Sequence, residues 1–104
     1  MSSPYLLLPN LNNFAPVVGR ATKVLHQDNK SKVVLLEFLP GQGLPPHAAA
    51  FPGFIMILTG EATLQLGDDT HQASSGFFAH MAPGLKHAIL AVTGLRMLLI
   101  LQLA

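Results

Sequence analysis

Glycines and prolines interrupt the middle of this chain and exclude a long helix there. Residues 41–60 read GQGLPPHAAAFPGFIMILTG, and residues 76–91 read GFFAHMAPGLKHAILA. Proline has no backbone N–H to donate, and it disfavours helical backbone in the residue before it. His47 and His87 follow directly on the Gly/Pro turns of these two stretches. We therefore expect two strand pairs whose histidines, His47 and His87, meet inside a small β-barrel.

Short apolar or alternating runs continue this pattern along the chain, separated by turn residues such as Asp28-Asn29 and Gly67-Asp68. No run keeps a 3.6-residue apolar period for three turns. The expected strands cover residues 21–27, 32–39, 54–58, 62–66, 70–73, 77–81, 87–92 and 95–103. Such a series predicts an all-β sandwich or barrel. We expect one barrel domain over residues 21–104, preceded by an extended apolar arm over residues 1–20.

Charge is unusually sparse. Half of the residues are hydrophobic and 11% are charged, against roughly 25% in an average soluble domain. The excess apolar surface favours a two-fold homodimer. The alternative is a monomer whose surface is rich in alanine, glycine and serine.

The same composition excludes several function classes. The net charge is +1 and the six basic residues are scattered, so a nucleic-acid partner is not expected. No cysteine is present, which rules out disulfides and thiolate metal sites. Prolines and His47 interrupt the uncharged run over residues 44–60, and prolines also break the apolar amino terminus. We therefore expect no membrane span and a cytoplasmic location.

The first punctuated stretch resembles the first motif of the cupin family, G-x(5)-H-x-H-x(3,4)-E-x(6)-G. Gly41, His47 and Gly60 stand at their motif positions. Ala49 replaces the second histidine, and Gly53 stands where the glutamate belongs. The stretch therefore keeps the glycine spacing of the motif and one of its three metal-binding side chains.

The second stretch resembles the second cupin motif, G-x(5)-P-x-G-x(2)-H-x(3)-N. Gly76, Gly84 and His87 match, Pro83 stands one residue after the motif proline, and Ala91 replaces the asparagine. Fifteen residues, 61–75, separate the two motifs, as in single-domain cupins. With its flanking strands, the resemblance covers roughly residues 20–103. It implies the double-stranded β-helix, a jelly-roll β-barrel.

The resemblance also implies a divalent metal, which the family holds with three histidines and a glutamate. This chain keeps two of those positions, His47 and His87. His80 is a third candidate ligand, if its strand turns it inward. Sites for zinc or iron usually need about three protein ligands, so a metal (Zn, Fe, Mn or Ni) would be weakly held or absent. No catalytic residue is predicted.

The missing ligands also leave space. We expect an apolar cavity for a small molecule inside the barrel. Its expected lining residues are Ala49, Gly53, Ile55, Ile57, Phe78 and Ile89. The alternative is a solid barrel whose core side chains fill that space.

Three functions follow from this sequence. The first is a single-domain cupin that binds a small molecule beside a partly degenerate two-histidine site. The second is a metal-dependent enzyme of dioxygenase or isomerase type, which would use His47, His87 and His80. The third is a structural or regulatory dimer without chemistry of its own. A barrel fold alone does not decide among them.

Overall fold

The structure is a computed structural model that describes residues 4–11 and 15–104. The described residues form nine strands and contain no helix. The strands are β1 (Ala21–Gln27), β2 (Ser31–Phe38), β3 (Gly43–Ala48), β4 (Gly53–Thr59), β5 (Glu61–Leu66), β6 (Asp69–Ser74), β7 (Phe78–Met81), β8 (Lys86–Ala91) and β9 (Leu95–Gln102). No helix of the described residues is long and apolar enough to cross a membrane.

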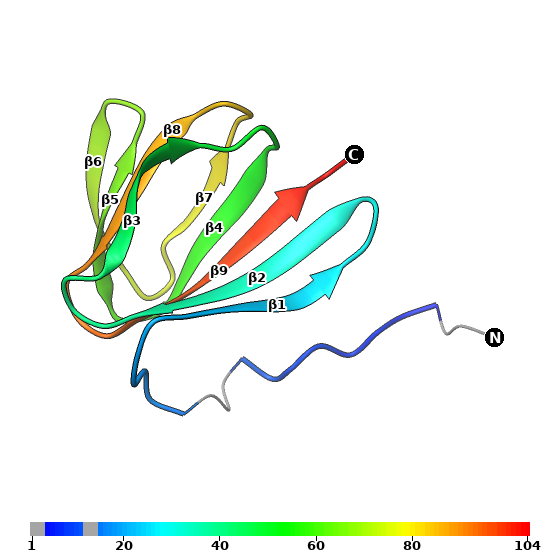
Figure 1. The fold of residues 1–104 in the computed structure, drawn as a ribbon, viewed down its shortest axis with the longest axis horizontal. Coiled ribbons are helices and arrows are strands. Elements are labelled where there is room, and N and C mark those ends of the chain that lie inside the picture. Colours follow the sequence, from blue (N-terminus) through cyan, green and yellow to red (C-terminus); the bar gives the residue numbers. More distant parts are fainter. Residues whose placement is uncertain (1–3, 12–14) are drawn as a thin grey trace.

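Two antiparallel sheets face each other across the core. One has the strand order β1-β2-β9-β4-β7, and the other has the order β3-β8-β5-β6. In Figure 1 the sheets converge at one end and spread apart at the other, where β3 ends and β8 begins. This arrangement confirms the predicted all-β jelly-roll barrel.

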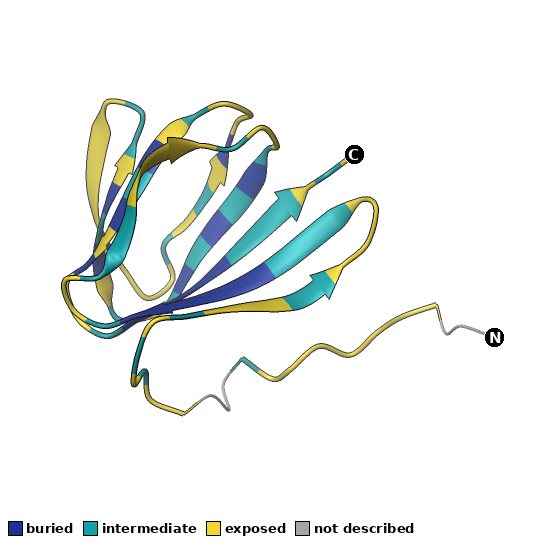
Figure 2. Cartoon of the chain, viewed as in Figure 1, coloured by how far each residue is buried: buried dark blue, intermediate teal, exposed yellow. Residues whose placement is uncertain are grey.

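The core follows from the alternation of side chains along the strands. In β4, Ile55 and Ile57 are buried and their neighbours Phe54, Met56 and Leu58 are half-buried. In β8, Ile89 and Ala91 alternate with more exposed residues. Successive side chains of a strand point to opposite faces. The buried set of each sheet therefore lies on the face toward the other sheet, which Figure 2 shows as dark bands on the strands.

Two glycines permit close approaches that no other residue allows. Gly60 has φ 92° and lies against the carbonyl of Gly94, in the turn between β4 and β5. Gly43 passes so close to β8 that a Cβ there would meet the carbonyl oxygen of Ile89. These contacts explain why glycines punctuate the chain at these positions.

The strand that carries His47 does not continue into β4. β3 ends at Ala48, and residues 49–52 lead across to β4, which belongs to the other sheet. Ile55 and Ile57 do point inward, but they do so from the facing sheet.

Candidate functional site

The structure brings His47 and His87 together. They are directly opposite each other in the β3–β8 pair, and their ring centroids are 4.2 Å apart with an angle of 57° between the rings. His87 alternates with buried Ile89 and Ala91, so its ring lies on the inner face of the sheet. A bulge between Leu44 and His47 changes the register of β3. The two histidines therefore lie together at the wide end of the barrel.

Backbone carbonyls orient both rings in the same way. Nδ1 of His47 lies 3.0 Å from the carbonyl oxygen of Pro45, and Nδ1 of His87 lies 3.0 Å from that of Leu85. A carbonyl oxygen only accepts, so each Nδ1 donates and each neutral ring keeps an unprotonated Nε2. Metal-binding histidines are commonly oriented by such a hydrogen bond.

The two histidines differ in their access to solvent. His87 is 6% exposed, whereas His47 is exposed. On the inner face, the row of paired residues that contains His47 and His87 continues through Leu66 on β5 to Asp69 on β6. Sequence reasoning missed Asp69, because it treated residues 67–69 only as a turn. It also missed Leu66, which it placed in a strand but not at the site. The site therefore lies at the wide end of the barrel, which we call its mouth. It combines one buried imidazole, one exposed imidazole and the apolar side chain of Leu66.

His80 and Phe78 do not belong to this site, which corrects the prediction made for both. Phe54, opposite His80 on β4, lies on the outer face because its neighbour Ile55 is in the core. The ring of His80 packs edge-on against that of Phe54, at 4.8 Å, and Phe78 stacks on the same ring at 5.5 Å. Phe78 is 59% exposed. Both side chains therefore face away from His47 and His87.

The other predicted lining residues lie deeper in the barrel and are packed. Ile55, Ile57 and Ile89 are 2%, 1% and 5% exposed and belong to the core cluster. Gly53 is buried, and a Cβ there would lie 2.9 Å from a backbone oxygen of β9. Ala49 is half-buried at the mouth, where its carbonyl accepts a hydrogen bond from Gly84. Side chains thus fill the space around these isoleucines.

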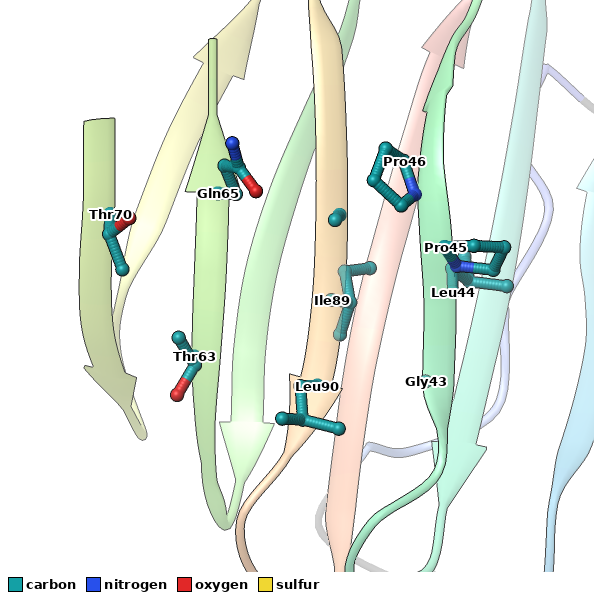
Figure 3. Close-up of a pocket in the computed structure, with 10 residues that line it drawn as sticks. Gly43, Leu44, Pro45, Pro46, Thr63, Gln65, Thr70, Ile89 and Leu90 are labelled. Atoms are coloured by element: carbon teal, nitrogen blue, oxygen red, sulfur yellow. The ribbon is translucent and has the colours of Figure 1, made fainter. Parts of the chain in front are cut away.

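A groove of about 460 Å³, which was not predicted from the sequence, lies on the outer face of the four-stranded sheet (Figure 3). Its wall is the proline bulge of β3, and its floor is made by outward residues of β8, β5 and β6. The lining residues are Gly43, Leu44, Pro45, Pro46, Thr63, Gln65, Thr70, Ala88, Ile89 and Leu90. The sequence signal for this groove was the alternation along β5, where polar outward residues separate buried apolar ones.

The donor set available for a metal is small. Among residues 4–11 and 15–104, no group of three or more His, Cys, Asp and Glu side chains could hold a metal ion. His47 and His87 bring two imidazole nitrogens to one place, and imidazole is a donor that suits zinc, iron and nickel. They supply half of the four ligands that the family uses.

Comparisons with known proteins agree with the fold. A family model described as "Cupin domain" matches residues 34–101. A cupin superfamily protein from Desulfitobacterium hafniense is 19% identical, with a TM-score of 0.81 over 100% of this chain and 95% of that one. An RmlC-like cupin protein from Desulfovibrio desulfuricans is 24% identical, with a TM-score of 0.75 over 98% and 96%. KdgF from Halomonas sp. is 16% identical, with a TM-score of 0.77 over 94% of each chain. A search of curated proteins found no match.

Proposed function

The chain belongs to the cupin family, and we propose that it binds a small molecule at the mouth of its barrel, beside a two-histidine metal site formed by His47 and His87. The observation that carries this proposal is the shared orientation of the two rings. Each Nδ1 donates to the carbonyl two residues before its histidine, and both Nε2 atoms are left as acceptors. Both rings thus present an unprotonated nitrogen, which is the atom that a neutral imidazole uses to bind a metal.

In this proposal Nε2 of His47 and Nε2 of His87 hold the metal. Imidazole nitrogen suits zinc, iron and nickel, while manganese prefers oxygen ligands. A bound metal would supply Lewis-acid chemistry there, polarising an oxygen of the small molecule. Because His47 and His87 would supply only two ligands, water or donor atoms of that molecule would supply the others. Because two protein ligands hold a metal weakly, we expect the metal and the small molecule to bind together.

The small molecule lies at the mouth in this proposal, because Ile55 and Ile57 are too tightly packed to line a free cavity. Its surroundings combine the open ring of His47 with the apolar side chain of Leu66. The carboxylate of Asp69 lies at the end of the same row. These groups suit a small, partly apolar molecule with oxygen donors that reach the metal.

Binding calorimetry with Zn²⁺ and Ni²⁺ tests the proposal. We expect one metal per chain in the wild type, and weakening by more than about tenfold in His47→Ala and His87→Ala, since loss of outer-shell partners alone costs about 10–100-fold. His71→Ala is the matched control, because His71 is exposed on β6 and contacts Phe77 instead. Equal binding by all four proteins, or none by the wild type, would overturn the proposal.

Small-molecule binding needs its own test, which is saturation-transfer NMR of a mixture of short hydroxy and keto acids, with and without Zn²⁺. The expected result is binding that requires the metal and is lost in His87→Ala. Turnover of a bound acid would instead support the enzyme alternative, with His47 and His87 as its metal ligands. Binding of no acid in either condition would favour a structural or regulatory role.

A further inference from the structure

The inner face of β2 carries a charged residue near the start of the strand. Val34, Leu36 and Phe38 of this strand belong to the core cluster. From Ser31 to Phe38, β2 pairs with β9 residue by residue, so alternation places Lys32 on the same face as Val34. Lys32 is half-buried. No other Asp, Glu, Lys or Arg among the described strand residues of the five-stranded sheet lies on that face.

The strand connections place Lys32 at the mouth of the barrel. Lys32 pairs with Leu101, and Leu101 pairs with Gly53, the first residue of β4. Residues 49–52 join the start of β4 to the end of β3, the strand that carries His47. In Figure 1 the beginning of β2 lies at the end where the two sheets spread apart. Lys32 and His47 therefore lie at the same end of the barrel.

The strand order also places Lys32 on the His47 side of this mouth. β6 contacts β4 across the barrel, so the β6 edge of the four-stranded sheet lies over the β4 and β7 side of the other sheet. The opposite edge, β3, then lies over β2. Facing sheets pack about 10 Å apart. Lys32 therefore points from β2 toward the strand of His47, while Asp69 on β6 belongs to the far side of the mouth.

Lys32 has no carboxylate partner within the part of the chain that the structure describes. The ion pairs of these residues join Lys23, His26 and Arg96 to other side chains, and none includes Lys32. A half-buried charge is costly without a partner. A divalent metal on the two histidines would add further positive charge at the same mouth. An anion between the metal and the ammonium removes this repulsion and gains a charge-assisted hydrogen bond.

We propose that Lys32 selects the small molecule by charge, and that this molecule is a hydroxy or keto acid with a second carboxylate. The hydroxy or keto acid end reaches the metal, and the second carboxylate pairs with the ammonium of Lys32. A single ammonium balances one carboxylate, whereas a phosphate group carries about two negative charges. The inference rests on the function proposed for His47 and His87, and it adds the class of molecule that binds there.

Two acids of equal chain length test the second carboxylate. L-malate carries it, and L-2-hydroxybutyrate has a methyl group in its place, while both present the same hydroxy acid end to the metal. NMR titrations of the full chain with Zn²⁺ present should show at least about tenfold tighter binding of malate, since a hydrogen bond to a charged group contributes about 1.5–3 kcal/mol. In Lys32→Met the two acids should bind equally, and zinc binding without acid should not weaken.

Lys30→Met is the matched control, because it removes the same charge from an exposed position just before β2. The preference for malate should persist in Lys30→Met and in Lys32→Arg, which keeps the charge. Circular dichroism checks the fold of each variant, and Lys32→Gln replaces Lys32→Met if that chain does not fold.

The inference is overturned if the wild type does not prefer malate, or if Lys32→Met keeps the preference. Loss of the preference in Lys30→Met overturns it as well, because the effect would then follow from net charge. These failures differ from a failure of the proposed function. Equal binding of both acids by the wild type leaves the metal and small-molecule site in place, whereas binding of neither acid removes both.

Discussion

Removal of Arg96 is expected to destabilise the protein strongly, because it leaves a buried carboxylate without its main partner. Nε and Nη2 of Arg96 lie 3.0 and 2.7 Å from Oε2 of Glu37, and the two side chains are 7% and 10% exposed. Removing one partner of such a pair typically costs about 3–5 kcal/mol. Lys23 lies 3.6 Å from Oε1 of Glu37 but is 55% exposed, so it compensates by at most about 1 kcal/mol. For Arg96→Met we expect a loss of about 3 kcal/mol.

Urea unfolding at one fixed protein concentration measures this loss, and in thermal unfolding it corresponds to a decrease in Tm of more than about 10 °C. The double variant Glu37→Leu/Arg96→Met removes both charges and should stay within about 2 kcal/mol of the wild type. Arg20→Met is the control for loss of an exposed arginine, whose contact with the ring of Phe38 at 5.6 Å is worth about 0.5–1 kcal/mol. A loss below about 1 kcal/mol in Arg96→Met, or a double variant as unstable as the single one, would refute the reasoning.

Three further changes have defined outcomes. Gly43→Ala should prevent β3 from pairing with β8, because its Cβ would overlap the carbonyl oxygen of Ile89; loss of native circular dichroism checks this, and an unchanged Tm would contradict it. Gly53→Glu, which restores the family's carboxylate, should lower Tm rather than add a ligand, since a backbone oxygen of β9 lies 2.9 Å from its Cβ; tighter zinc binding at unchanged Tm would show the opposite. Hydrogen bonds from His26 and from two backbone N–H groups lower the pKa of Asp28 below its usual 3.8. The ionised carboxylate therefore contributes to stability above pH 3.8, and this contribution is lost as the pH falls further. In acid unfolding, Asp28→Asn should lack this pH-dependent loss of stability.

The sequence predicted the strands well because turn residues and alternation mark their ends. β1, β4 and β5 lie within a residue or two of the expected ranges. β3 was the exception. Pro45 and Pro46 hid its strand character, although a bulge leaves these two residues out of the pairing with β8. Proline is tolerated at such positions because no ladder hydrogen bond is required there.

The candidate site was predictable only in part. The meeting of His47 and His87 followed from the two motifs, because their glycines fix the positions of both strands. The direction of His80 did not follow, since a turn separates it from His87 and both faces of β7 are largely apolar. The packing around Ile55 and Ile57 depends on side chains that the facing sheet contributes, and no pattern within β4 specifies those.

The most direct test of the two-histidine site is nitrogen NMR of the protein with isotope-labelled histidine, titrated with Zn²⁺. Before metal is added, the rings of His47 and His87 should both carry their proton on Nδ1. During the titration, the Nε2 signals of these two residues should shift together, while those of His71 and His80 stay in place. Movement of only one of the pair, or movement of His80 with them, would contradict the account.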